Sequence, residues 1–244
     1  MRQNGIDMQE TLSFYINLAS LVVRVNSRYE KSRDFCAEYL TDSDAADIVS
    51  EVSDEDIDRE IEGNTSLSRE YCENVCLYRA IAEQLPSFSR MVFHGAAVSV
   101  CGRGYIFTAP SGTGKSTHVE LLERYFGEEV RIINGDKPII GVGSDSVTVY
   151  STPWAGKEGW QNKTEAPLVG IIILRRGKEN KIRRVSPSEY FSELMTHVYI
   201  PKHGDMTLKT LELLDSLAKK VDFYLLECDI SKEAAETSFR IMSE

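Results

Sequence analysis

The residues best suited to chemistry form one glycine-rich segment, Ala109-Pro110-Ser111-Gly112-Thr113-Gly114-Lys115-Ser116-Thr117. Its pattern, a small residue, four variable positions and then Gly-Lys-Ser, is typical of a loop that binds phosphate between a strand and a helix. Gly112 and Gly114 permit left-handed backbone angles that turn successive N–H groups toward an anion. The helix that follows adds the positive end of its dipole. The alternative is a turn that only connects two elements.

The ligand expected in such a loop is ATP or another nucleoside triphosphate, together with Mg²⁺. Lys115 would reach the β- and γ-phosphates, and the hydroxyl of Ser116 would bind Mg²⁺. The residues predicted to hold the nucleotide here are Ser111, Gly112, Thr113, Gly114, Lys115, Ser116 and Thr117.

A second metal ligand is expected at the end of a neighbouring strand, and Asp136 follows the predicted strand 130–133. We predict that Asp136 binds the metal ion or accepts a proton. The alternative is turn capping, because Asn134-Gly135-Asp136 is also good turn chemistry. A run of four apolar residues that ends in Asp, common in ATP-hydrolysing proteins, is missing.

Further candidates follow in the chain. Lys157 lies between the two tryptophans, Trp154 and Trp160, and we predict that it contacts phosphate or substrate; the tryptophans either bind or pack. Arg175 and Arg176 end an apolar strand, where an arginine can stabilise charge on a transferring phosphoryl group, and Arg175 is the candidate. We predict a packing role for His118 and solvated loop positions for His197 and His203.

The elements that must position these residues follow from periodicity and turn signals. The predicted strands span 18–25, 96–100, 105–109, 130–133, 138–142, 147–152, 168–174, 181–185 and 223–226. The predicted helices span 68–84, 116–125, 206–220 and 231–244, with two further helix starts at Ser53 and Ser186, each followed by an acidic residue three positions later.

Composition excludes several classes of protein. The chain has 244 residues, 42% of them hydrophobic, which suits a globular α/β protein rather than a disordered or disulfide-rich one. Residues 1–90 hold 9 basic and 18 acidic side chains, which disfavours nucleic acid as a partner. No apolar run is long enough to span a membrane, and Met1–Glu10 is polar, so we expect a cytoplasmic protein with no membrane partner. The five cysteines are expected to be reduced, with Cys72 and Cys76 in the core rather than on a metal.

Residues 94–160 resemble the C-terminal domain of HPr kinase/phosphorylase and its relatives, which share the nucleotide-binding fold of phosphoenolpyruvate carboxykinase. The resemblance rests on the glycine-rich segment and on His94-Gly95-Ala96-Ala97-Val98, Asn134-Gly135-Asp136-Lys137-Pro138 and Thr152-Pro153-Trp154-Ala155-Gly156-Lys157. It implies a mixed-sheet nucleotide-binding domain over 91–244, with a smaller α+β lobe over 1–90.

The resemblance also implies an activity. The γ-phosphoryl group of MgATP would pass to a hydroxyl acceptor on a small protein, a peptide or a metabolite. Asp136, Lys115 and His94 would be catalytic, and Ser116 and Asp136 would bind Mg²⁺. Gly135 stands where a first Asp is usual, and no Arg-Gly-Leu-Gly signature is present, so the reverse reaction and HPr itself are not expected. A nucleotide-dependent switch and a nucleotide hydrolase are the alternatives, and a homo-oligomer stays open.

Overall fold

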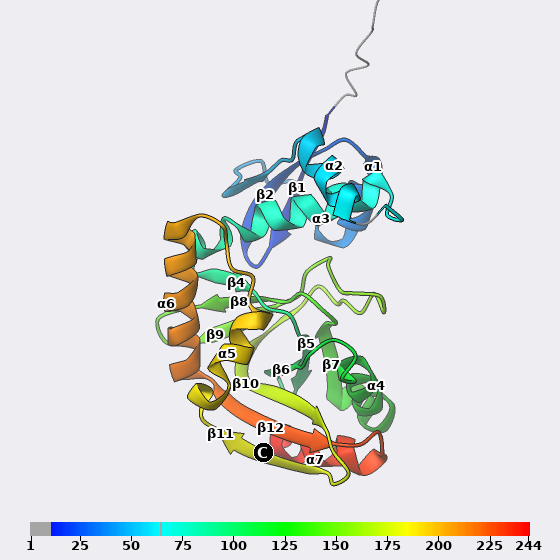
Figure 1. Ribbon diagram of the computed structural model, residues 1–244, viewed down its shortest axis with the longest axis vertical. Helices are drawn as coiled ribbons and strands as arrows, with labels where there is room; N and C mark the ends of the chain where they lie inside the picture. Colours follow the sequence, from blue (N-terminus) through cyan, green and yellow to red (C-terminus); the bar gives the residue numbers. More distant parts are fainter. Residues whose placement is uncertain (1–10, 64) are drawn as a thin grey trace, which may run out of the picture. The chain divides into compact units, whose positions relative to one another are not determined.

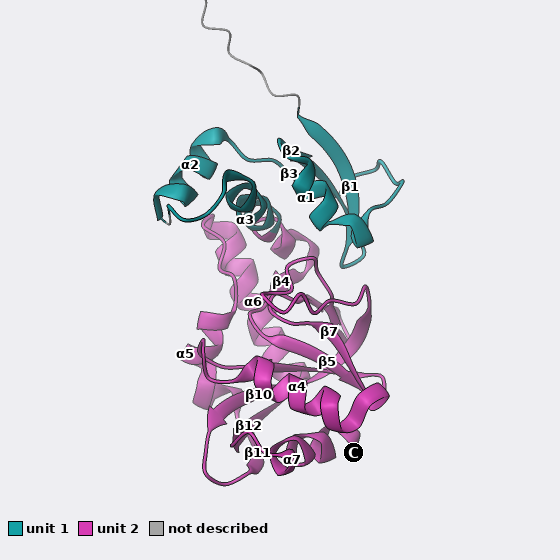
Figure 2. Ribbon diagram, turned by 90° about the vertical axis from the view of Figure 1, so that its right-hand side faces the viewer, with its two compact units in different colours: residues 1–81 teal, residues 82–244 magenta. Residues whose placement is uncertain are grey.

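A computed structural model describes residues 11–63 and 65–244. The chain divides into two compact units, Met1–Ile81 and Ala82–Glu244 (Figure 2). The division precedes the boundary predicted after residue 90. The polar segment Met1–Glu10 lies outside the described residues. No helix in the part of the chain that the structure describes has both the length and the apolar character needed to cross a bilayer.

The first unit contains a small sheet in the order β1-β2-β3, made of β1 (Leu12–Leu18), β2 (Leu21–Ser27) and β3 (Ile48–Ser50). The single strand predicted over 18–25 is wrong, because Leu18 pairs with Leu21 across a tight hairpin. Its turn residues, Ala19 and Ser20, have φ angles of 51° and 63°. Such turns normally carry Asn or Gly, so the uninterrupted apolar sequence hid the reversal.

Four helical segments belong to this unit, two between β2 and β3 and two after β3. They are α1 (Glu30–Phe35), η1 (Ala37–Tyr39), α2 (Asp54–Gly63) and α3 (Arg69–Ala82). The predicted start of α2 is confirmed: Ser53 Oγ accepts a hydrogen bond from Asp56 N (3.1 Å), and Asp56 Oδ2 accepts one from Ser53 N (3.2 Å). Cys72 and Cys76 on α3 are buried, as predicted.

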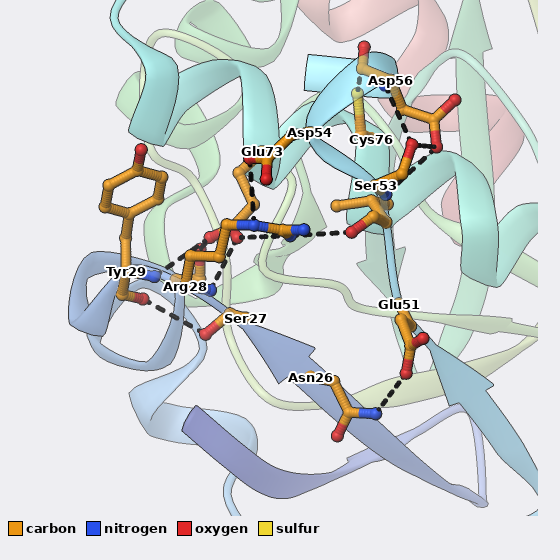
Figure 3. Close-up of polar contacts among 12 residues, drawn as sticks. Asn26, Ser27, Arg28, Tyr29, Glu51, Ser53, Asp54, Asp56, Glu73 and Cys76 are labelled. Carbon is orange, nitrogen blue, oxygen red and sulfur yellow. Dashed lines mark hydrogen bonds and ion pairs between the residues drawn. The ribbon is translucent and has the colours of Figure 1, made fainter. Parts of the chain in front are cut away.

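One buried carboxylate ties α3 to the turn between β2 and α1 (Figure 3). Glu73 is fully buried and accepts hydrogen bonds from Arg28 N (2.7 Å), Tyr29 N (3.4 Å) and Ser32 Oγ (2.9 Å). The guanidinium of Arg28 lies 3.9 Å from the same carboxylate. Buried donors that lose such an acceptor are costly, so this contact is a main determinant of the unit's stability.

We predict that Glu73→Ala lowers the free energy of unfolding of this unit by about 3 kcal/mol, because buried N–H and O–H donors lose their acceptor. The measurement is urea unfolding of the full chain. The matched control is Glu70→Ala on the same helix, whose pair with Lys31 is exposed and should cost about 0.5 kcal/mol or less. Equal effects of the two substitutions would contradict the anchoring role.

The second unit is built on one large mixed sheet in the order β4-β8-β9-β10-β6-β5-β7, with β12 beside β10 and β11 beside β12. Its strands are β4 (Arg90–Val92), β5 (Ala96–Val100), β6 (Arg103–Thr108), β7 (Val130–Asn134), β8 (Ile139–Val142), β9 (Val147–Tyr150), β10 (Glu165–Arg176), β11 (Lys181–Val185) and β12 (Asp222–Cys228). The structure thus confirms a mixed α/β architecture and every strand predicted after residue 90.

The direction of the strands decides where their ends meet. β10 runs parallel to β6 and to β12. β5 runs antiparallel to both β6 and β7, so β7 has the same direction as β6. Strands β6, β7, β10 and β12 therefore all end at one edge of the sheet, and β5 begins there.

Helices cover both faces of this sheet (Figure 1). They are η2 (Leu85–Phe88), α4 (Lys115–Phe126), η3 (Gly127–Glu129), α5 (Pro187–His197), α6 (Gly204–Lys220) and α7 (Lys232–Ser243). Ile171 and Ile173 of β10 share one cluster with residues of α5 and α6, whereas Ile172 and Leu174 share the other with α4 and α7. This alternation along β10 assigns each side chain to one helical layer.

Candidate active site

The predicted functional residues gather at the edge where the parallel strands end. The 109–114 loop follows β6, Asp136 follows β7, and Arg175 and Arg176 end β10. His94 comes just before β5, which starts at the same edge, and Gly95 N donates a hydrogen bond to Asp136 O (3.0 Å). The order and direction of the strands thus bring segments that are far apart in the sequence to one edge of the sheet.

The 109–114 loop has the predicted backbone form. Gly112 and Gly114 have φ angles of 76° and 122°, and a Cβ added to either would meet no atom within 4 Å. Thr113 closes the turn, since its N–H and its hydroxyl both donate to Pro110 O, at 3.2 and 2.7 Å. Helix α4 begins at Lys115, so its N-terminal N–H groups adjoin the open side of the loop.

Lys115 is held against this loop. Its Nζ donates to Ala109 O (3.0 Å). Burial lowers the pKa of Lys115, while the charges of Asp136 and Glu158 act in the opposite direction. Ser116 and Thr117 follow Lys115 in the first turn of α4. Glu158, whose charge acts on Lys115, was not predicted, because no sequence pattern singles it out.

A buried amide shapes the turn that carries Asp136. Asn134 Oδ1 accepts hydrogen bonds from Asp136 N (2.9 Å) and Lys137 N (2.7 Å). Its Nδ2 donates to the carbonyl and hydroxyl oxygens of Thr152, at 2.9 and 3.1 Å. The turn-forming role that the sequence assigns to this segment therefore falls to Asn134, and the Asp136 carboxylate is left available.

The carboxylate of Asp136 lies between two basic side chains. His94 Nε2 is 3.2 Å from Oδ1, and Lys137 Nζ is 3.2 Å from Oδ2. Burial acts to raise the pKa of Asp136, but the hydrogen bond from His94 and the charge of Lys137 outweigh it and hold the pKa below its usual range. Asp136 is therefore ionised at neutral pH.

The loop that follows Thr152 packs directly on this turn. A Cβ on Gly135 would lie 2.7 Å from Ala155 O, so an aspartate cannot occupy position 135 without moving the loop. Gly156, with φ of 81°, packs over Asp136, and the exposed Lys157 and Glu158 follow it. Trp160 packs on the α4 side of the sheet, which favours the packing interpretation for this tryptophan.

The two arginines at the end of β10 face opposite layers. Arg175 forms an ion pair with Glu193 of α5. Arg176 donates from Nε to Thr113 O (3.0 Å) and from Nη2 to Gly112 O (2.6 Å). The predicted phosphate contact of Arg175 stays a prediction, whereas Arg176 contacts the loop itself. Strand alternation could have separated them, because Arg176 shares its face with Leu174 and α4.

The expectation that His197 is a solvated loop residue is wrong. His197 is the last residue of α5 and is 5% exposed, and its carbonyl accepts a hydrogen bond from His94 N (2.6 Å). Neither ring nitrogen has a hydrogen-bond partner among the described residues, and Glu193 Oε1 is 4.0 Å from Nε2. Burial, helped by electrostatic interactions with His94, Lys115 and Arg175 and opposed by Glu193, lowers the pKa of His197 to about 4. His203 is exposed, as predicted, and His118 is buried against Ser238.

We predict that Asn134→Ala costs about 3 kcal/mol of unfolding free energy, because two N–H donors and two acceptors lose their partner in a buried turn. Urea unfolding of the full chain measures this. Asn134→Asp serves as a second variant: it keeps the acceptor oxygen but adds a negative charge near Asp136, so it should also destabilise. A cost below about 1 kcal/mol for both variants would refute the role given to the amide.

The lowered pKa of His197 predicts an acid-sensitive fold. Protonation is opposed in the folded state, so the stabilisation is complete above the usual histidine pKa of 6.5 and is lost as pH falls toward 4. His197→Leu should reduce the slope of the unfolding free energy against pH in this window by an amount that corresponds to at most about one proton. His118, whose pKa burial also lowers to about 4, keeps some slope in both proteins. An unchanged slope would show that His197 titrates normally.

Comparisons with known proteins add little to this site. No protein-family profile matches the chain. No curated protein matches it either. Among solved structures, the Hpr(Ser) kinase/phosphatase from Coxiella burnetii is similar over 62% of this chain and 94% of its own, with 10% identity and a TM-score of 0.38. A likeness this weak carries no conclusion about the present chain.

Proposed function

We propose that this protein is an ATP- and Mg²⁺-dependent kinase that transfers the γ-phosphoryl group to a hydroxyl acceptor. One observation carries the proposal. A loop and a helix N-terminus suited to an anion lie at the same sheet edge as the ionised carboxylate of Asp136, whose charge acts on Lys115. Phosphoryl transfer requires mainly positioning and neutralisation of charge, and this edge offers groups for both.

The loop suits a triphosphate on its own geometry. The space above Gly112 and Gly114 is open, so phosphate oxygens can approach the backbone closely. Lys115 would exchange its bond to Ala109 O for the β- and γ-phosphates, which offer it a stronger, charged acceptor.

The donor set also suits Mg²⁺, which prefers hard oxygen ligands. The hydroxyl of Ser116 and the carboxylate of Asp136 would hold the ion together with phosphate oxygens. Bound there, Mg²⁺ would neutralise charge on the phosphates.

Asp136 would also accept the proton of the attacking hydroxyl. The oxygen of the acceptor forms a bond to the γ-phosphorus, the bond between that phosphorus and the leaving oxygen of ADP breaks, and the hydroxyl proton passes to Asp136. His94, 3.2 Å from Oδ1, holds the carboxylate in place and limits its rotation. The acceptor would be a serine of a small protein or peptide, or a small hydroxylated molecule.

A nucleotide-dependent switch is the second candidate, favoured by one observation. The packing of Ala155 O against Gly135 leaves one aspartate in the turn, so metal binding and proton acceptance both fall on Asp136. A switch needs only the first of these roles.

The test is transfer of γ-labelled phosphate from MgATP in an extract of the source cells, with proteins and small molecules separated afterwards. We expect the wild-type chain to label an acceptor, and we expect Lys115→Ala and Asp136→Asn to reduce labelling by at least about 100-fold. Lys209→Ala, at an exposed position on α6, is the matched control and should label normally.

The other outcomes separate the alternatives. Binding of ATP without movement of label in any fraction would overturn the kinase proposal in favour of the switch. Release of labelled phosphate without an acceptor would indicate a hydrolase. Retention of full transfer by Asp136→Asn would remove Asp136 from the reaction.

A further inference from the structure

Arg176 contacts the 109–114 loop through two hydrogen bonds from its guanidinium group. Its two hydrogen bonds end on the carbonyl oxygens of Gly112 and Thr113, at 2.6 and 3.0 Å. These carbonyls belong to the stretch whose N–H groups would face phosphate. An arginine offers its donors in a rigid planar fork, so two neighbouring carbonyls can be held at once.

The consequence for the loop follows from peptide geometry. In a planar trans peptide the C=O and the N–H point in opposite directions. When Arg176 holds Gly112 O and Thr113 O on its own side, the N–H groups of Thr113 and Gly114 point away from it. Thr113 N then donates to Pro110 O (3.2 Å), so Gly114 N is the loop donor that this arrangement offers to an anion.

The charge of Arg176 acts in the same direction. Hydrogen bonds to a charged donor are stronger than neutral ones, and they polarise the peptide groups that accept them. A guanidinium on the carbonyl side therefore strengthens the N–H donors on the opposite side. The residue can support phosphate binding without touching the phosphate.

The placement of Arg176 is fixed by the sheet. Ile173 of β10 pairs with Thr108 at the end of β6, so Arg176, three residues later, lies beside the loop that leaves β6. Alternation along the strand turns Arg175 to α5 and Arg176 to the layer of α4. The neighbouring arginine cannot take over its role.

We propose that Arg176 is a positioning residue that holds the loop carbonyls and so presents the loop N–H groups to the β- and γ-phosphates. This rests on the proposed nucleotide-binding function. Arg176 would therefore order the loop before any nucleotide binds.

The experiment has two readouts on the full chain. Hydrogen exchange of the loop amides, measured without nucleotide, reports how firmly the loop is held. Calorimetric titration with MgATP and with AMP reports whether a loss of affinity is confined to the outer phosphates. The variants are Arg176→Met, which keeps the stem without donors, and Arg176→Lys, which keeps the charge without the fork. The control is Arg184→Met, which removes an exposed arginine of β11 that pairs with Asp222 of β12.

We expect both Arg176 variants to speed exchange in the loop and to weaken MgATP binding about tenfold, while AMP binding and the melting temperature stay unchanged. Wild-type affinity in Arg176→Lys beside a loss in Arg176→Met would overturn the proposal, because charge alone would then suffice. Equal losses for MgATP and AMP, or no change in exchange, would overturn it too. If the wild-type chain binds no MgATP, the proposed function fails, and the exchange data still decide whether Arg176 orders the loop.

Discussion

The shared direction of β6, β7, β10 and β12 is the constraint on which the rest of this structure depends. Parallel neighbours end at the same edge, and that edge collects what the chain places after each strand. The glycine-rich loop, the aspartate turn and the arginine pair therefore lie at the same edge, where Arg176 contacts the loop directly. The antiparallel β5 adds His94 from the opposite direction.

Within that edge, side-chain hydrogen bonds to the main chain and close backbone packing do most of the positioning. Asn134 holds two N–H groups of the Asp136 turn, Arg176 holds two carbonyls of the loop, and Ala155 O occupies the space that a second acidic side chain at position 135 would need. The side chains proposed for chemistry, Asp136 and Lys115, are therefore supported by residues that take no part in it. The glycine at position 135, which leaves one aspartate in the turn, matches the close packing of the following loop.

Much of this fold could be predicted from the sequence, because its signals are local. The glycines before Lys115, the capping residues of α2 and α5, and the apolar run of β10 each encode their element within a few residues. The hairpin at Ala19-Ser20 could not be predicted, since neither residue normally takes its backbone angles. The sites of Glu158 and His197 depend on contacts across the chain, which no local pattern encodes. The position of Arg176 could be predicted in part, because alternation along β10 turns Arg176 rather than Arg175 toward the layer of α4.

The central claim is that the loop after β6 and the aspartate after β7 act on one nucleotide. A crystal structure of the chain with Mg²⁺ and a non-hydrolysable ATP analogue tests it most directly. The account predicts β- and γ-phosphates on the N–H groups of 112–115, with the metal ion between Ser116 and Asp136. A nucleotide bound elsewhere, or phosphates in the loop with the metal ion remote from Asp136, would contradict it.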